Sequence, residues 1–403
     1  MTCSGLLRRL TKSAFADFAW APRNDGLEGK PISSQLRTMQ TDQPTGVLTV
    51  DLGALRANWR RLADHIAPTE CAAVVKADAY GTGCAQAAAA LRREGARTFF
   101  VARLGEALRL REQAPDVTIY LLDGLGSGAA PACLAHDVRP VLGSLPELEE
   151  WVAACAGAPR PAALHLDTGM NRLGLSSHEI EAARPLLGQA GVALLMSHFT
   201  SSERPEAAEN RVQIETFRAL RDLCGSAIPA SLANSAGIFL LERPWFDLAR
   251  PGYALYGGNP TPDQPNPMRP VVSLHVPILR LREIAAGEAV GYNRRWTAKR
   301  PSRIATIALG YADGIPRGAA GTDERPGPDV AIEGRRCPIV GRVSMDLITV
   351  DVTDLDPRSV RRGSPVEVLG PTIGVDEFGE RSGTIGYEIL TGLGARYQRN
   401  YQA

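Results

Sequence analysis

The sequence predicts an α/β fold: a (β/α)8 barrel of the TIM type followed by a mostly-β C-terminal domain. From Val47 onward, short runs rich in Val, Ile and Leu alternate with longer amphipathic stretches, as in repeated β-α units. Eight such runs precede residue 270, and eight parallel strands separated by helices favour a closed barrel. After the Pro-rich segment 257–270, the runs become short and Gly-punctuated, without long helices between them.

Each element follows from the spacing of its apolar residues. Leu52, Leu55, Trp59, Leu62 and Ile66, for example, recur at helical intervals. The barrel strands are predicted to end near Val75, Ala102, Leu122, Leu142, Leu166, Ser197, Ala233 and Ala249. Further strands are predicted within 272–284, 303–309, 337–343 and 347–353, and a short helix within 385–398.

These patterns predict three parts of the chain. Residues 45–271 are expected to form the barrel, which would bind a cofactor, and residues 272–403 the β-rich domain. Residues 1–44 begin with a basic segment, which is one feature of targeting sequences. We expect instead a disordered tail or a wrongly assigned start, because Met39 would be a suitable first residue.

Composition excludes several classes of protein. The 403 residues are 44% hydrophobic and carry a formal net charge of +1, so no global field attracts nucleic acid. No run of about 18 uncharged apolar residues predicts a membrane span. The seven cysteines contain no C-x-x-C pair, so neither a disulfide framework nor a metal site is predicted, and a cytoplasmic location is favoured.

Reactive residue types follow directly after the predicted barrel strands, where barrel enzymes carry their active sites. They are Lys76, Asp167, Arg172, His198, Asn234, Ser235, Arg250 and Gly252. Lys76 is notable because only four of the 45 lysines and arginines are lysines. A lysine in the apolar stretch 73–81 therefore indicates chemistry that arginine cannot perform, above all a Schiff base with an aldehyde cofactor. The alternative is a surface lysine that extends its ammonium group into solvent.

The seventh and eighth loops, ANSAG (233–237) and RPGY (250–253), supply a hydroxyl group and Gly-rich backbone. Barrels commonly bind a phosphate group at these loops. Each motif alone is typical of an ordinary turn. Together with a lysine after the first strand, they indicate pyridoxal phosphate.

With these residues in view, residues 46–403 resemble the alanine racemases, a family of pyridoxal-phosphate enzymes of fold type III. The resemblance rests on nine motifs in order. They are AVVKADAYG (73–81), LHLDTGMNRLG (164–174), SHF (197–199), LANSAG (232–237), DLARPGYALYG (247–257), GYNRRW (291–296), ALGYADG (308–314), VGRVSMD (340–346) and IGYEILTGLG (385–394).

The resemblance implies an isomerase that interconverts L-alanine and D-alanine with pyridoxal 5'-phosphate on Lys76. Arg250 would face the pyridine nitrogen and leave it unprotonated, which disfavours side reactions such as transamination. The residues expected to hold the cofactor are Lys76, Tyr80, Arg172, His198, Asn234, Ser235, Arg250, Gly252, Tyr253 and Tyr387. Those expected to contact or admit the substrate are Arg172, Tyr311, Met345 and Asp346, with Asp313 beside them.

Racemisation through a planar carbanion needs one base on each face. The family pattern assigns Lys76 to the α-proton of the D-isomer and Tyr292 to that of the L-isomer, with His198 and Arg250 helping the phenol to lose its proton. Tyr292, Tyr311 and Met345 would reach the barrel of the other subunit. The resemblance thus implies a homodimer that completes each active site across its interface.

This chain departs from the family at several positions. His165 stands where many members have a carbamylated lysine that positions the arginine, so another acceptor, a bound anion or the imidazole, must hold Arg172. Ser344 stands where cysteine is frequent, and Thr82 replaces a common histidine. Residues 293–295 are larger than those that often follow the catalytic tyrosine.

Three other readings compete with this one. A broad-specificity amino-acid racemase would share most of these motifs, although we would expect it to be exported with a clear signal peptide. A non-catalytic carrier of pyridoxal phosphate would share the lysine and the phosphate loops but would lack residues 272–403. A decarboxylase of the same plan would not need Tyr292. The motifs are compatible both with biosynthesis of D-alanine for peptidoglycan precursors and with alanine catabolism.

Overall fold

The structure, a computed structural model, describes residues 46–403. The extension predicted over residues 1–44 lies outside the described residues. Within residues 46–403, no helix combines the length and apolarity that a membrane crossing needs.

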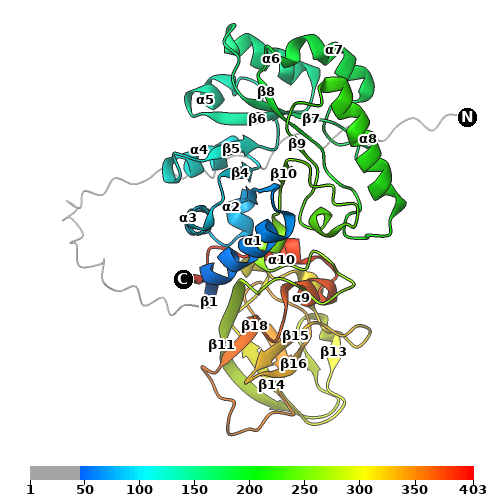
Figure 1. Cartoon of the computed structure of the whole chain (residues 1–403). Helices are drawn as coiled ribbons and strands as arrows, with labels where there is room; N and C mark the ends of the chain where they lie inside the picture. The colour runs from blue at the N-terminus through cyan, green and yellow to red at the C-terminus, as the bar shows by residue number, and fades with distance from the viewer. Residues whose placement is uncertain (1–45) are drawn as a thin grey trace, which may run out of the picture. The chain divides into compact units, whose positions relative to one another are not determined.

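The first sheet consists of parallel strands that follow one another in chain order (Figure 1). Seven hydrogen-bonded neighbours make up most of it: β3 (Ala73–Val74), β4 (Thr98–Val101), β5 (Thr118–Leu121), β6 (Val138–Leu142), β7 (Ala162–His165), β8 (Val192–Met196) and β9 (Ala230–Ser231). The short strand β2 (Glu70–Cys71) precedes β3 and pairs in parallel with β10 (Leu248–Ala249).

Strand β10 closes this sheet. Only Ala72 separates β2 from β3, and its amide donates to the carbonyl of Ala249 at 2.9 Å. On the other side of β10, the amide of Arg250 donates to the carbonyl of Ala233 at 2.8 Å. Strand β10 therefore bridges β9 and the first strand, and the predicted eight-stranded barrel is confirmed. Each observed strand ends within two residues of its predicted end.

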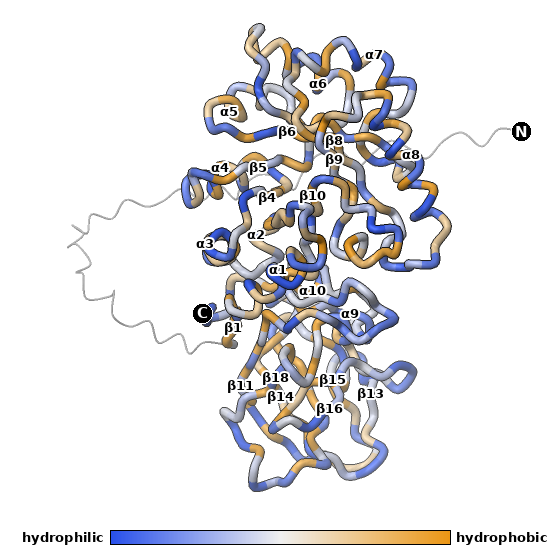
Figure 2. The backbone as a smooth tube through the Cα atoms, viewed as in Figure 1, coloured by the Kyte–Doolittle hydropathy of each residue, from blue (hydrophilic) through white to orange (hydrophobic). Residues whose placement is uncertain are grey.

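Helices precede the first barrel strand and connect the later ones, in the way the apolar spacing predicts. They are α1 (Leu52–Ile66), α3 (Cys84–Glu94), α4 (Leu104–Gln113), α5 (Ala130–Ala135), α6 (Leu145–Cys155), α7 (Ser177–Leu187) and α8 (Ala208–Cys224). Helix α8 buries Gln213, Ile214, Phe217 and Leu220, which lie on one face at a period of about 3.6 residues. Hydrophobic and hydrophilic residues accordingly alternate along α8 in Figure 2. Buried apolar side chains of the helices and strands thus form one hydrophobic core in the barrel.

The second sheet has eight strands and confirms the mostly-β character predicted after the barrel. In spatial order they are β14 (Ser302–Ile307), β17 (Ile348–Asp351), β16 (Arg335–Val340), β15 (Asp329–Ile332), β18 (Pro365–Leu369), β11 (Val272–Ile284), β1 (Val47–Asp51) and β19 (Gln398–Gln402). Strand β11 also pairs with β14. A separate hairpin joins β12 (Ala289–Val290) to β13 (Trp296–Thr297).

Strand β1 belongs to the second sheet, although it precedes the barrel in the chain. It pairs antiparallel with β11 and parallel with β19. Its residues Leu48 and Val50 are fully buried, whereas the residues between them are partly exposed. This alternation is typical of a strand with one face on a core, and it does not reveal which sheet the strand joins.

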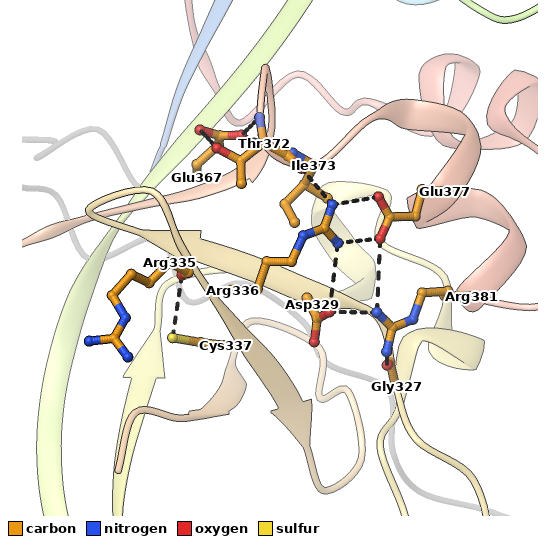
Figure 3. A network of polar contacts seen from close by, with 10 residues as sticks. All are labelled: Gly327, Asp329, Arg335, Arg336, Cys337, Glu367, Thr372, Ile373, Glu377 and Arg381. Carbon is orange, nitrogen blue, oxygen red and sulfur yellow. Dashed lines mark hydrogen bonds and ion pairs between the residues drawn. The ribbon is translucent and has the colours of Figure 1, made fainter. Parts of the chain in front are cut away.

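Two short helices complete the fold, α9 (Val375–Arg381) and α10 (Gly386–Gly392). Helix α10 confirms the short helix predicted within 385–398. Helix α9 is anchored to the sheet by a network of charged side chains (Figure 3). Arg336 of β16 binds both carboxylate oxygens of Glu377, and Arg381 binds Asp329 of β15 at 2.5 Å. Charge-assisted, bidentate contacts of this kind fix orientation well.

Candidate active site

Lys76 lies at the carboxyl end of the first barrel strand, where α2 (Lys76–Tyr80) begins directly after Val75. Its side chain is partly buried. Burial is the main cause that lowers the pKa of its ammonium group, and the positive charge of Arg172 adds to the effect. Such surroundings favour a neutral amine, which is the nucleophilic form.

The backbone after Lys76 turns in the left-handed sense. Ala77, Asp78, Ala79 and Tyr80 have φ angles of 53°, 54°, 54° and 55°. For L-residues this conformation costs roughly 1–2 kcal/mol per residue. Hydrogen bonds that include one from the Ala79 amide to the Val75 carbonyl, at 3.0 Å, hold the turn. Strain of this kind persists only where the surrounding structure enforces it, and it is concentrated at functional sites.

Arg250 is buried just beyond β10, with 4% of its surface exposed. Its guanidinium group donates to the hydroxyl of Ser231 and to the backbone carbonyl of Ser197. Burial lowers the pKa of Arg250 to about 9, so the group stays charged at neutral pH. Both of these acceptors are uncharged, which leaves a buried positive charge at the mouth of the barrel.

Two histidines share this region. Burial, together with the charge of Arg250, lowers the pKa of His198 to about 3 and that of His165 to about 4. Both imidazoles are therefore neutral at pH 7 and can accept as well as donate hydrogen bonds. His165 is thus a buried neutral side chain and carries no negative charge, unlike the carbamylated lysine found at this position in many family members.

Arg172 lies in the loop after β7 and is exposed. The loop is held by Asp167, whose Oδ1 atom accepts from the amides of Gly169 and Met170 at 3.0 Å each. The charge of Arg172 lowers the pKa values of Lys76, His165 and His198. The structure therefore brings Arg172 to the same site as these predicted residues.

The predicted phosphate-binding residues also come together. The hydroxyl of Ser235 accepts from the amides of Gly252, at 3.0 Å, and Ala254, at 3.2 Å. A Cβ atom on Gly252 would lie only 2.3 Å from the hydroxyl oxygen of Tyr80, so this position has room only for glycine. The ring of Tyr387 lies 6.3 Å from that of Tyr80, measured between centroids. Hydroxyl groups and backbone amides thus gather around one small space.

The phenols at this space keep their protons at neutral pH. Burial raises the pKa values of Tyr80, Tyr253 and Tyr387 well above the ordinary phenol range. Protonated hydroxyl groups can donate hydrogen bonds to an anion, which is what a phosphate group requires.

Asn234, also predicted at the cofactor site, makes its hydrogen bonds within its own loop. Its side-chain oxygen accepts from the hydroxyl of Ser202 at 2.9 Å and from the amide of Gly237 at 2.8 Å. These bonds fix the turn into η2 (Gly237–Phe239). The contacts of Asn234 therefore stabilise the loop that carries Ser235.

The β-rich part of the chain after residue 271 carries the other predicted residues. Tyr292 lies in η4 (Tyr292–Arg294) and is 66% exposed. Tyr311 and Met345 lie in adjacent loops, because the amide of Tyr311 donates to Ser344 at 3.0 Å and that of Ala312 to Met345 at 3.0 Å. Among residues 46–403 of one chain, no contact joins Tyr292 to Lys76, and Tyr292 is not among the groups that shift the pKa of Lys76.

Asp346 and Asp313 are linked through one arginine. Arg396 lies 2.7 Å from a carboxylate oxygen of Asp346 and 3.2 Å from one of Asp313. Asp313 is buried and also accepts from the amide of Gly310 at 2.9 Å. This arrangement orders the loops around Tyr311 and Met345.

Sequence reasoning missed three residues at the site. Asp376 of α9 accepts from the hydroxyl of Tyr253 at 2.5 Å, and Tyr256 donates to the carbonyl of Val74 at 3.0 Å. Glu106 of α4 accepts from the amide of Ala77 at 2.8 Å. Tyr256 lies within a motif that the sequence had singled out, whereas an acidic residue in the first turn of a helix is too common to signal a site.

Taken together, the barrel mouth has a partly buried amine, a group of hydroxyls and backbone amides suited to an anion, and a buried guanidinium group. Comparison with known proteins agrees with this chemistry. The family described as alanine racemase, N-terminal domain, matches residues 50–260. The family described as alanine racemase, C-terminal domain, matches residues 271–401.

Individual proteins give the same result. An alanine racemase of Methylobacterium nodulans is 56% identical over 358 residues, which cover 88% of this chain and 95% of that protein. The crystal structure of alanine racemase from Bartonella henselae with covalently bound pyridoxal phosphate has a TM-score of 0.84 at 40% identity. That of the biosynthetic alanine racemase from Pseudomonas aeruginosa has a TM-score of 0.83 at 38% identity. Both cover 89% of this chain and 99% of their own. The chain therefore belongs to the alanine racemase family.

Proposed function

We propose that this chain interconverts L-alanine and D-alanine with pyridoxal 5'-phosphate as its cofactor. The observation that carries the proposal is the placement of Lys76 beside the phosphate cradle at one end of the barrel. A nucleophilic amine and an anion-binding cradle are the two features that a phosphorylated aldehyde requires. The solved relative from Bartonella henselae is described with this cofactor covalently bound.

The residues present fit the cofactor. Ser235, the backbone of Gly252 and Tyr253, and the hydroxyls of Tyr80 and Tyr387 would hold the phosphate group. Lys76 would hold the aldehyde carbon. When bound, pyridoxal phosphate joins the amino group of the amino acid and withdraws electrons, which weakens the bond between Cα and its proton.

Arg250 would face the nitrogen of the cofactor ring. Burial lowers the pKa of Arg250 only to about 9, so at neutral pH its guanidinium group keeps its protons and donates hydrogen bonds rather than transferring them. His198 carries no charge at neutral pH, since its pKa is about 3. In the proposed network Arg250 is therefore the cation that helps Tyr292 of the partner subunit to lose its proton, and His198 contributes hydrogen bonds.

We further propose two bases on opposite faces of the substrate. Lys76 would take the α-proton of D-alanine, and Tyr292 of the partner subunit that of L-alanine. Arg172 and the amide of Met345 would bind the carboxylate group of alanine. Tyr311 and Asp346 would line the entrance.

A homodimer is part of this proposal, because Tyr292 does not contact Lys76 within one chain. The loops of the second sheet expose large apolar side chains: Tyr292 (66%), Tyr311 (44%), Met345 (53%) and Leu347 (42%). A monomeric protein rarely leaves a group of such side chains exposed unless a partner covers it. A second copy of the chain would bury this surface and deliver Tyr292.

Charge supports the same pairing. A cavity near Tyr292 is lined by Arg295, Arg317, Arg325 and Arg342, without an acidic residue in its wall. A cavity at the barrel loops is lined by Glu203, Glu206, Glu242 and Asp263. Opposite charges on the second sheet and on the barrel favour a head-to-tail arrangement of two copies.

We propose a cytoplasmic location from the cysteines. Six of them are described, and all six are free thiols. Free thiols in this number are typical of a reducing compartment.

The test is incubation of the purified protein with L-alanine in deuterium oxide. Optical rotation should decay to zero while deuterium enters Cα. Retention of both rotation and Cα–H would refute the proposal. Serine, lysine and arginine, tested in parallel, should react far more slowly than alanine; comparable rates would favour a broad-specificity racemase.

Borohydride reduction followed by peptide mapping tests the cofactor site separately. The label should appear on Lys76, and label on another lysine would contradict its role. Cofactor on Lys76 without any exchange of α-protons would instead indicate a carrier protein.

A further inference from the structure

Glu106 joins the turn after Lys76 to the end of the neighbouring barrel strand. It lies in the first turn of α4, which follows β4. Its Oε1 atom accepts from the amide of Ala77 at 2.8 Å, and its Oε2 atom accepts from the amide of Ala102 at 2.8 Å. A third bond, from the amide of Arg103 at 3.2 Å, completes the set.

The Ala77 amide is the peptide group directly after Lys76. The left-handed turn that begins there has a conformation that L-residues avoid, so it needs fixed partners outside the turn. Glu106 supplies such a partner from a different β-α unit. Displacement of this bond would move the Cα atom of Lys76 and, with it, the amine.

Charged side chains of both signs surround Lys76 and have opposite effects on the pKa of its amine. Arg172 and Arg250 act to lower the pKa of its amine, whereas Asp123 and Glu106 act to raise it. Asp123 is largely exposed and lies 3.9 Å from Arg103, which offsets its charge. Glu106 is partly buried, and its hydrogen-bond donors are uncharged amides.

Other groups lie around these two residues. Asp78, Arg109 and the Cys84 thiol share a cavity wall with Glu106. His198 lies near Lys76 but titrates far below neutrality, with a pKa of about 3. Asp123 and Glu106 both offset the two arginines, and of these two carboxylates Glu106 is the one that also bonds to the turn after Lys76.

We propose that Glu106 is a positioning residue for Lys76. Through the Ala77 amide it fixes the amine at the barrel mouth, and through its negative charge it lets the amine take up a proton between the two arginines. The inference rests on the proposed function, in which Lys76 must both bond to the cofactor and accept the α-proton.

The test uses the pH dependence of Lys76 acylation in the cofactor-free full-length chain. Acetic anhydride acylates an amine only in its neutral form, and mass spectrometry of peptides separates the four lysines of the chain. In Glu106→Gln the midpoint of Lys76 acylation should move to lower pH, because the anion that stabilises the ammonium form is gone. Exposed Lys299 is the internal reference and should not shift.

Two further variants separate charge from geometry. Glu112→Gln removes an exposed carboxylate from the same helix and should leave the Lys76 midpoint unchanged. Glu106→Asp keeps the charge but is one methylene shorter, so it should retain a midpoint near that of the wild type. With cofactor restored, both Glu106 variants should lose kcat by roughly tenfold or more, with little change in KM, because the amine is misplaced.

An unchanged midpoint in Glu106→Gln, or an equal shift in Glu112→Gln, would overturn the proposal. If Glu106→Gln does not fold, wild-type kcat in Glu106→Asp would overturn the geometric part. The acylation midpoint does not depend on the cofactor. Failure of the proposed function would therefore appear as absent racemisation in the wild type, and failure of this inference as an unmoved midpoint.

Discussion

The ring of Tyr253 is stacked on the ring of Tyr387, with centroids 3.8 Å apart and planes inclined by 12°. Tyr253 comes from the last loop of the barrel and Tyr387 from α10. The stack thus joins the two halves of the proposed phosphate cradle, and Asp376 fixes it by accepting from the Tyr253 hydroxyl. The charged network in Figure 3 holds the helix that carries Asp376.

Tyr253→Phe should keep the stack but lose the bond to Asp376. A hydrogen bond to a charged group contributes about 1.5–3 kcal/mol, so the free energy of unfolding should fall by about that amount. Urea denaturation measures it. Tyr397→Phe is the matched control, because that hydroxyl donates to the neutral carbonyl of Asp313 at 2.7 Å and its loss should cost only about 0.5–1.5 kcal/mol. A smaller loss in Tyr253→Phe than in the control would contradict this account.

Gly252→Ala should weaken cofactor binding. The added Cβ would lie 2.3 Å from the Tyr80 hydroxyl oxygen, so one of the two must move away from the phosphate cradle. We expect Kd for pyridoxal phosphate to rise about tenfold, equivalent to ~1.4 kcal/mol, in a fluorescence titration. Gly188→Ala has open space around it and should bind as the wild type does.

The same clash predicts that substitutions at Gly252 and Tyr80 have non-additive effects on cofactor binding. In a Tyr80→Phe background the substitution Gly252→Ala should cost less, because the nearest remaining ring atom lies 3.0 Å from the added Cβ. Equal costs in both backgrounds would show that the clash is not the cause.

Lys76→Ala and Tyr292→Phe should each abolish racemisation when present in every subunit. When the two variants are co-expressed or refolded together, each mixed dimer has one intact site, with Lys76 from one subunit and Tyr292 from the other. Random pairing makes half of the dimers mixed, so activity should return to about a quarter of the wild-type value per subunit. No recovery in confirmed mixed dimers would place both residues in one subunit.

Stability should fall in weakly acidic solution because of His198 and His165. Their pKa values are about 3 and about 4 in the folded chain, against about 6.5 when unfolded. Between these limits the unfolded state binds more protons, so stability decreases as pH falls from about 6.5 towards 4. Each histidine contributes a slope of up to ~1.4 kcal/mol per pH unit.

Denaturation curves at several pH values test this expectation. His198→Gln should remove part of the slope, whereas His136→Gln, at an exposed position, should not. Identical slopes for all three proteins would mean that other groups govern acid stability.

Much of the barrel could be predicted from local pattern. The ends of eight strands were predicted within two residues, because the apolar runs and the helices between them have distinct periods. Lys76 could be singled out because lysine is rare in this chain and follows a strand end. Both the strand ends and the position of Lys76 can be predicted because they depend on residues that are close together in the sequence.

The partners that hold the site could not be predicted in this way. Asp376 lies 123 residues from Tyr253 along the chain, and Glu106 lies 29 residues from Ala77. Nothing in their sequence surroundings distinguishes them from other acidic residues near a helix start. The left-handed turn after Lys76 is equally hidden, since Ala-Asp-Ala-Tyr contains no glycine.

The sequence by itself determined the order of strands and helices and the residue types at the strand ends. Tertiary structure alone decided that β1 joins the second sheet and that Tyr253 meets Tyr387. It also decided that Tyr292 stays apart from Lys76 within one chain. The physical reason is that periodicity records which face of an element is buried, whereas the identity of the surface that buries it depends on contacts between distant segments.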